Sequence, residues 1–168
     1  MTPLHEVIIN NKTTIKPVWI MRQAGRYLSE FREIRKKNPN FIELCLNYRL
    51  SSEITLQPIK RFDLDAAIIF SDILMLPYGL NQKVEFKKNF GPTLSNLDIS
   101  SMSKIDEIDF VEKIYPVYKA IKFVSTEMDS KNKNTIGFVG APWTLLVYMI
   151  NQQSPKKNVK KDFFKDTH

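Results

Sequence analysis

Cysteine, histidine and glycine are all scarce in this chain of 168 residues. The single cysteine, Cys45, excludes a framework of internal disulfides and is typical of a reducing compartment. We interpret it as a small buried apolar residue. The two histidines, His5 and His168, lie near opposite ends, and no set of His, Cys and carboxylate side chains has metal-ligand spacing. With "GFVGAP" as its richest glycine stretch, the sequence predicts neither a metal site nor a phosphate-binding loop.

Long hydrophobic runs are also missing. The longest ones, around "AAIIF" and "WTLLVYMI", fall well short of the roughly 18 residues that a membrane-spanning helix needs. The first residues, "MTPLHEVIINNK", lack a basic stretch followed by an apolar one, so we expect no signal peptide. These absences predict a cytoplasmic protein with no membrane partner.

What the chain does have is an ordinary core and an excess of positive charge. A hydrophobic fraction of 43% predicts a folded protein, and the length predicts a single domain over residues 1–168. The net charge of +7 favours an anionic partner, which leaves nucleic acid, acidic lipid and a small polyanionic substrate open. Nucleic acid is disfavoured because the lysines are scattered and no recognised motif is present.

Strands and helices alternate along the predicted structure, which favours βαβ units and a parallel sheet. We expect Ser29 to cap the first helix, Pro116 to lie inside a long one, and Trp19 and Trp143 to be core residues. In the long helix, Tyr115 and Tyr118 fall near the apolar face. The predicted strands are 17–21, 64–70 and 135–140; the predicted helices are 29–37, 48–62, 103–128, 142–150 and one in the tail 154–166; a β-ribbon covers 83–94.

Parallel units place functional residues at the carboxyl ends of their strands. Arg22 and Arg26 follow the first predicted strand, Asp72 follows the second, and Ala141 and then Tyr148 follow the third. The topology therefore predicts that these polar groups converge on one side of the sheet.

The stretch "MRQAGRY" places two arginines four positions apart. Arginine offers a planar fork of donors that binds carboxylates, and we expect Gly25 to take a positive φ that brings backbone N–H groups toward a ligand. The alternative is a loop with two solvated arginines, Arg22 and Arg26.

Asp72 and Tyr148 each have a structural and a functional interpretation. Asp72 is either a helix cap or a carboxylate whose ionised form two nearby arginines favour. Tyr148 is either a buried tyrosine with a satisfied hydroxyl or a side chain of the site.

Four stretches, in this order and spacing, resemble the signatures of the uroporphyrinogen decarboxylase family: "PVWIMRQAGRY", "EITLQPIKRF", "LDAAIIFSDIL" and "GFVGAPWTLLVYM". The resemblance extends from Pro17 to Ile150 and leaves 1–16 as an N-terminal extension. It implies a cofactor-free (β/α)₈ TIM barrel, a homodimer, and removal of carboxyl groups from the four acetate side chains of uroporphyrinogen III to give coproporphyrinogen III for haem synthesis. That tetrapyrrole carries eight carboxylates, which agrees with the paired arginines.

The resemblance also implies roles for individual residues. Asp72 matches the aspartate that binds the pyrrole N–H groups and stabilises the protonated intermediate. Arg22 matches a carboxylate-binding arginine that is also a candidate proton donor or relay, and Tyr148 matches a tyrosine near the reacting centre. The implied catalytic residues are Asp72, Arg22 and Tyr148, and the implied substrate-binding residues are Arg22, Gln23, Ala24, Gly25, Arg26, Arg35, Asp72 and Tyr148.

Two departures from the family pattern accompany the match. Ser29 stands where the family has proline. An eightfold barrel typically needs about 250 residues, whereas this chain has three recognisable βα starts and lacks the family's downstream hydroxyl residue and C-terminal histidine. We therefore expect the incomplete N-terminal portion of a barrel, and two functions stay open: a decarboxylase, or a truncated non-catalytic remnant that retains anion or partner binding.

Overall fold

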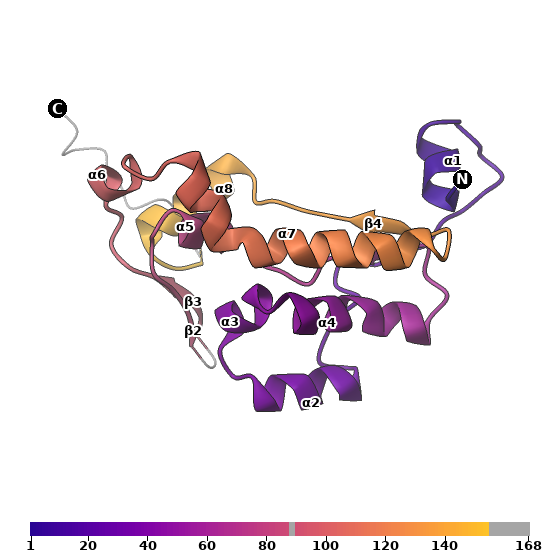
Figure 1. The fold of residues 1–168 in the computed structure, drawn as a ribbon, viewed down its shortest axis with the longest axis horizontal. Helices are drawn as coiled ribbons and strands as arrows, with labels where there is room; N and C mark the ends of the chain where they lie inside the picture. Colours follow the sequence, from indigo (N-terminus) through magenta and orange to yellow (C-terminus); the bar gives the residue numbers. More distant parts are fainter. Residues whose placement is uncertain (88–89, 155–168) are drawn as a thin grey trace. The chain divides into compact units, whose positions relative to one another are not determined.

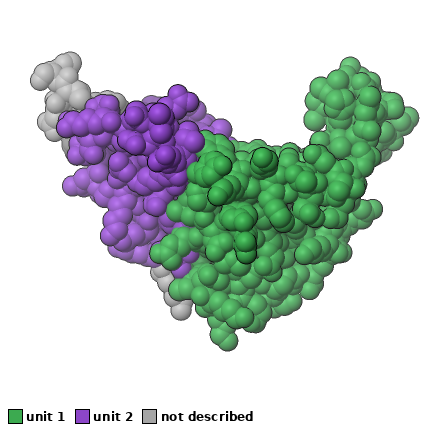
Figure 2. All heavy atoms as spheres, viewed as in Figure 1, with its two compact units in different colours: residues 1–39, 43–71, 115–138 green, residues 40–42, 72–114, 139–168 purple. Residues whose placement is uncertain are grey.

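The computed structural model describes residues 1–87 and 90–154, which form two compact units. Unit 1 comprises residues 1–39, 43–71 and 115–138, and unit 2 comprises residues 40–42, 72–114 and the described residues from 139 on (Figure 2). No helix in these described ranges combines the length and the apolar character that crossing a lipid bilayer requires. The elements labelled in Figure 1 are α1 Pro3–Ile8, α2 Ser29–Lys37, α3 Phe41–Leu46, α4 Tyr48–Arg61, β1 Ala66–Ile68, α5 Met75–Gly79, β2 Val84–Lys87, β3 Gly91–Leu94, α6 Ile99–Met102, α7 Glu107–Asp129, β4 Asn134–Ile136 and α8 Pro142–Asn151.

Unit 1 is organised around two parallel strands, β1 and β4. Ala67 lies opposite Thr135, and Ile68 lies opposite Ile136. The chain between the two strands includes α7, so the pair has the crossover connection that parallel strands require. The α/β class and both strands are confirmed, although each strand is shorter than predicted.

The predicted strand over residues 17–21 is wrong for this structure. Val18 lies beside Asp65, the residue before β1, but residues 17–20 form no ladder with this strand. The amide of Val18 donates to the Asp65 carboxylate (2.7 Å) instead of a backbone carbonyl, while Val18 O accepts from the Asp65 amide (2.9 Å). Pro17 has no N–H to extend the pairing.

Helix α4 contributes to both apolar clusters of unit 1. One cluster contains Ile54 of α4 and the other contains Leu56, so the apolar residues of this helix divide between two faces. Figure 1 shows α2 lying alongside α4. Cys45 of α3 is fully buried, which confirms its interpretation. The two clusters are Leu28, Phe31, Leu44 and Ile54, and Leu56, Ala67, Ile69, Val124 and Met128.

Several details of the helices differ from the sequence-based expectations. Helix α2 begins at Ser29, but its N-cap is Leu28, and the Ser29 hydroxyl bonds to Glu30 instead of a backbone amide. In α7, Tyr115 and Tyr118 are exposed rather than on the buried face. The buried residues in the later turns of α7 are Ala120, Val124 and Met128, at the spacing of one helix face.

The prediction that both tryptophans are core residues is also wrong. Trp19 is 40% exposed and Trp143 is 63% exposed. Each belongs to an apolar stretch that the described part of its unit does not cover. Large apolar side chains left open in this way mark surfaces that a further segment or partner could bury.

Unit 2 is built from the predicted β-ribbon and α8. Strands β2 and β3 pair antiparallel, and Gly91 opens β3 with a φ of 91°, which favours glycine. The buried Gln82 Nε2 donates to Ser95 O (2.8 Å) and Met149 O (3.1 Å), tying the ribbon to α8. Pro142 lies in the first turn of α8, as predicted. The predicted tail helix falls almost entirely outside the described residues.

Candidate functional site

The loop that carries Arg22 and Arg26 is anchored by a buried glutamine. Gln23 is 2% exposed, its Nε2 donates to Ala66 O at the start of β1 (2.9 Å), and its Oε1 accepts from the Ile20 amide (3.3 Å). The Tyr27 hydroxyl donates to Gln23 O. The Gln23 side chain is thus used within the protein, and it fixes the loop against β1.

Arg32 anchors the same loop from the first turns of α2. Its Nη1 donates to Arg26 O (2.8 Å) and Tyr27 O (3.2 Å). Neither Arg32 nor Tyr27 was assigned a role from the sequence. A basic side chain early in a helix is normally solvated, so no sequence signal pointed to the contacts of Arg32. For Tyr27, the one available signal was its position four residues after Gln23.

Arg22 and Arg26 present their guanidinium groups to solvent. Both residues are exposed, and neither side chain forms an ion pair or hydrogen bond with a described residue. Two cations without partners, on a loop held by Gln23, can bind carboxylates without first breaking internal bonds.

Gly25 does not adopt the predicted backbone conformation. Among the described glycines only Gly91 has a positive φ, so the expectation of a left-handed Gly25 is wrong. A Cβ at Gly25 would lie 3.6 Å from Tyr27 Cδ1, an ordinary contact. The hydrogen bonds of the Gln23 anchor, rather than glycine's freedom, define this loop. Ala24 is partly buried against the cluster that contains Leu28.

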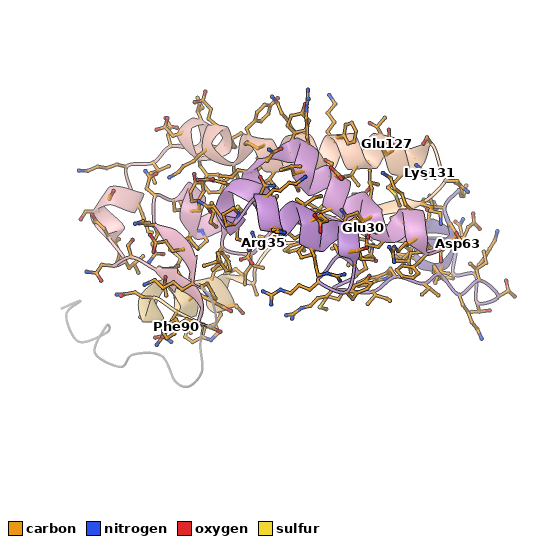
Figure 3. The ribbon with its side chains drawn as sticks, turned by 90° about the horizontal axis from the view of Figure 1, so that it is seen from below. Glu30, Arg35, Asp63, Phe90, Glu127 and Lys131 are labelled. Atoms are coloured by element: carbon orange, nitrogen blue, oxygen red, sulfur yellow. The ribbon has the colours of Figure 1, made fainter. Side chains whose placement is uncertain are left out.

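Arg35 adds a third cation to unit 1. It projects from the last turn of α2 (Figure 3), and its Nη1 donates to Asn38 O (2.7 Å) and Pro39 O (3.2 Å). Burial lowers the pKa of its guanidinium, and the charge of Arg26 lowers it further. Because arginine stays protonated at neutral pH, Arg26 and Arg35 together create a positive field that favours an anion.

Asp72 is held in a tight turn directly after the strand segment. Its Oδ1 accepts from the Leu74 amide (2.8 Å), and no described residue bonds to Oδ2. Helix α5 begins only at Met75, with Leu74 as its N-cap, so Asp72 shapes the approach to the helix and is not its cap.

Burial has the largest effect on the pKa of Asp72. Burial raises the pKa of the half-buried Asp72 carboxyl, and the Leu74 amide opposes that rise. Arg22 and Arg26 belong to unit 1 and Asp72 to unit 2, so the expected stabilisation of the ionised form by two arginines stays a prediction. A positive group beside Asp72 would lower the pKa of this carboxyl and favour its ionised form.

Tyr148 lies on α8 and is half-buried. Its hydroxyl lies 3.4 Å from Ser154 Oγ, a long hydrogen bond in which either oxygen could be the donor. Its neighbours in α8, Val147, Met149 and Ile150, are buried. The phenol is thus supported by packing and weakly bonded at its oxygen.

The predicted site residues divide between the two units. Residues 22–26 and Arg35 belong to unit 1, and the structure brings Arg26 and Arg35 into electrostatic contact there. Asp72 and Tyr148 belong to unit 2. In the described ranges no three His, Cys, Asp or Glu side chains gather in a way that could hold a metal ion.

Comparison with known proteins identifies the family. The sequence profile of the family described as "Uroporphyrinogen decarboxylase (URO-D)" matches residues 1–168. The chain is 47% identical over 144 residues to the uroporphyrinogen decarboxylase of Agrobacterium fabrum, covering 85% of this chain and 42% of that relative. The relative from Rickettsia bellii is 46% identical over 147 residues, covering 88% of this chain and 42% of its own length.

A third relative, from Campylobacter jejuni (strain RM1221), is 43% identical over 150 residues, with 88% of this chain and 44% of that relative covered. The chain thus spans less than half the length of each of these relatives, and the matched stretch is their N-terminal part. A profile match over the whole chain and identities of this size leave one assignment: the chain belongs to the uroporphyrinogen decarboxylase family.

Proposed function

We propose that this chain supplies the N-terminal part of an enzyme that decarboxylates the four acetate side chains of uroporphyrinogen III, giving coproporphyrinogen III without a cofactor. The observation that carries the proposal is the family match over residues 1–168, with relatives named for this reaction. As part of the same proposal, the complete enzyme is a cytoplasmic homodimer that makes haem precursors.

The architecture that we propose is the first three units of a (β/α)₈ barrel, within one domain over residues 1–168 that includes the N-terminal extension 1–16. Support comes from the order of neighbours in unit 1. Residues 17–20 lie beside the start of β1 through Val18 and Asp65, and β4 pairs parallel on β1. Three consecutive segments side by side are what successive barrel strands would give.

In this proposal the arginines of unit 1 bind substrate carboxylates. Arg22 and Arg26 are exposed and without internal partners, and Arg35 adds charge close to Arg26. A substrate with eight carboxylates needs several such cations for neutralisation and orientation. The backbone of residues 23–25 would complete the binding loop.

Asp72 would stabilise the charge that the reaction creates. Losing CO₂ from an acetate on a pyrrole requires an electron sink, and protonation of the ring carbon forms a cation that accepts the electrons. Burial raises the pKa of Asp72, and its Oδ2 has no described partner. A pyrrole cation beside it would favour the ionised carboxylate and donate an N–H to Oδ2. Arg22 is the proposed proton donor or relay, and Tyr148 would lie near the reacting ring.

A chimera tests the proposal. Residues 1–150 of this chain replace the matched N-terminal part of the Agrobacterium fabrum relative, and the product is assayed for uroporphyrinogen consumption and coproporphyrinogen formation. We expect turnover within about tenfold of the relative's own rate, since 1.4 kcal/mol of misfit at the junction would already cost that factor. A folded chimera with no turnover would contradict the proposal.

The second candidate function is the non-catalytic remnant. It is favoured by the exposure of Trp19 and Trp143, large apolar side chains that a partner could bury. Such a remnant would bind tetrapyrrole carboxylates or a protein partner without turnover. A folded but inactive chimera would favour it.

We expect Arg26→Ala to raise the KM of the chimera for uroporphyrinogen by about ten- to a hundredfold, the value of one or two charge-assisted hydrogen bonds. Arg26→Lys should lie between Ala and wild type, because lysine keeps the charge but lacks the planar fork. Steady-state kinetics measures both. Arg49→Ala, which removes an exposed arginine packed on Tyr48, is the control and should leave KM unchanged. Equal KM values for wild type and both Arg26 variants would remove this role.

Gln23→Leu should destabilise the chimera by about 1–3 kcal/mol, because Ala66 O loses its donor and the Ile20 amide its acceptor in a buried place. Urea unfolding followed by circular dichroism gives the free energy of unfolding. Asn10→Leu removes an exposed amide of unit 1 and should change stability by less than about 0.5 kcal/mol. Equal losses for the two variants would show that the anchor adds nothing.

A further inference from the structure

Tyr48, the first residue of α4, has a hydroxyl that accepts a hydrogen bond from a guanidinium. The Arg49 Nε donates to the Tyr48 hydroxyl oxygen (3.1 Å), and Arg49 Cζ lies 5.8 Å from the centre of the Tyr48 ring. A positively charged donor stabilises the ionised form of the oxygen that accepts from it. Arg49 thus lies where a phenolate at Tyr48 would need a counter-charge.

A second cation lies close to the same ring and comes from α7. The Lys119 Nζ lies 5.9 Å from the centre of the Tyr48 ring and 5.0 Å from the centre of the Tyr115 ring, within the range of cation–π attraction. Helices α4 and α7 share the apolar cluster that contains Leu56 and Val124, so the contact lies within unit 1. Two elements therefore place a cation beside Tyr48.

These neighbours favour the ionised phenol. The hydrogen bond from Arg49 lowers the pKa of Tyr48 most, the charges of Arg49 and Lys119 lower it further, and burial opposes the shift. Neither cation forms an ion pair with a described residue, so no carboxylate there competes with the phenolate for them. Tyr27 differs, because desolvation raises its pKa and its hydroxyl donates to Gln23 O.

The Tyr48 oxygen is also accessible. Tyr48 is half-buried, whereas Arg49 and Lys119 are exposed. The Tyr48 hydroxyl accepts from Arg49 but donates its own proton to no described residue, so that proton can leave to solvent without breaking an internal bond. A stabilised oxygen anion that a reagent can reach is what a nucleophilic side chain requires.

We propose that Tyr48 is a modification site, a nucleophile that takes an acyl group from an activated acyl donor. The Tyr48 oxygen forms a bond to the carbonyl carbon of the donor, and the bond from that carbon to the leaving group breaks. The leaving group departs with the electron pair and receives the phenol proton through solvent, so the step needs no oxidant or reductant. Arg49 and Lys119 stabilise the oxygen anion that attacks.

This proposal goes beyond the proposed decarboxylation and does not rest on it. Tyr48, Arg49 and Lys119 have no part in the proposed substrate site, and the test measures acylation instead of turnover. Acylation would replace the phenol by a neutral ester, which has no anion for the two cations to stabilise.

The test is acetylation of the 168-residue chain with N-acetylimidazole at a series of pH values below about 10, the ordinary pKa of a tyrosine. Peptide mass spectrometry follows each tyrosine, and hydroxylamine identifies the phenol esters, because it removes acetyl groups from oxygen and leaves those on lysine. We expect Tyr48 to react at lower pH than Tyr27, although Tyr27 is 56% exposed. In Arg49→Ala, acetylation of Tyr48 at neutral pH should slow at least about threefold, because the phenolate loses its charged donor.

A pair of lysine variants tests the contribution of α7. Lys119→Ala should slow the acetylation of Tyr48 measurably but less than Arg49→Ala does, since its charge has the smaller effect. Lys122→Ala, which removes another exposed lysine of the same helix, is the matched control and should leave the Tyr48 rate unchanged. The Tyr27 rate should be the same in wild type and all three variants.

Circular dichroism of each variant checks folding, and if Arg49→Ala unfolds the chain, the comparison of Tyr48 with Tyr27 in wild type decides. The proposal would be overturned if Tyr48 reacted no faster than Tyr27, or if its rate were equal in wild type and a folded Arg49→Ala. Equal losses for Lys119→Ala and Lys122→Ala would also overturn it, because the effect would then be that of general surface charge.

Discussion

Purified alone, residues 1–168 should consume no uroporphyrinogen above the uncatalysed background. The interior of a closed barrel is filled by layers of side chains from all eight strands. The described part of this chain supplies only β1, β4 and the segment 17–20, so these layers cannot form. Arg22 and Arg26 are solvated, so each attracts a carboxylate with about 1 kcal/mol in water-like surroundings instead of several in a dry site. The electrostatic stabilisation on which the proposed reaction depends is then lost.

The measurement compares the purified chain with the chimera and with a mock purification from the same host. The chimera supplies the same Arg22, Arg26 and Asp72 within a complete barrel, so it separates missing residues from missing surroundings. Size-exclusion chromatography of the isolated chain runs alongside, because exposed Trp19, Trp143 and Phe138 should promote self-association. Turnover by the isolated chain above the mock level would show that the other strands are dispensable.

In the chimera, Asp72→Asn should lower kcat by about a hundred- to a thousandfold, the usual loss when a preorganised group facing transition-state charge is neutralised. The asparagine keeps an oxygen that accepts from the Leu74 amide, so the turn should persist. Because burial already raises the pKa of Asp72, the neutral variant should fold at least as well as wild type. Steady-state kinetics and urea unfolding together measure both expectations.

Asp98→Asn is the matched control. Its Oδ1 also accepts a backbone amide, from Ser101 (3.0 Å), at the start of α6, but it is exposed and outside the proposed site. It should leave kcat within about twofold, since surface substitutions usually change free energies by less than about 0.5 kcal/mol. Near-normal turnover of Asp72→Asn would refute the role given to this carboxylate.

The sign of the pH dependence follows from the raised pKa of Asp72. In the window between the unfolded pKa and the higher folded pKa, the folded chain binds more protons than the unfolded chain, so this group makes stability fall as pH rises. Asp72→Asn removes that contribution. The free energy of unfolding of the variant, minus that of wild type, should thus increase as pH rises through this window, as urea unfolding at several pH values measures.

Helices and strands with strong periodicity were predictable from the sequence. Helix α4 lies within one residue of its predicted bounds, and the apolar run at β1 marked a buried strand. For residues 17–21 the same reasoning predicted a strand that the structure does not contain. Their composition favours a strand, but strand formation depends on a partner ladder, and Asp65 supplies a side-chain acceptor to Val18 instead.

The candidate site was predictable only in its residue types. Sequence spacing placed Arg22 and Arg26 on one loop after an apolar segment, and the structure gives the loop its anchor through Gln23, Tyr27 and Arg32. The bond from Gln23 to Ala66 O joins residues far apart in the sequence, and the bonds of Tyr27 and Arg32 end on backbone carbonyls, so none of them leaves a periodic pattern. The prediction that Trp19 and Trp143 are buried failed for a related reason. Apolar character indicates that a side chain favours burial, but it does not identify the segment that would cover it.

Cys45 gives this chain a built-in reporter. It is the single thiol in 168 residues and it is fully buried within α3 in unit 1. A thiol-specific reagent can reach it only when the surrounding helices separate, so the labelling rate measures how often unit 1 opens under native conditions. The same thiol therefore lets one labelling experiment compare the opening of the isolated chain under different conditions without introducing a probe.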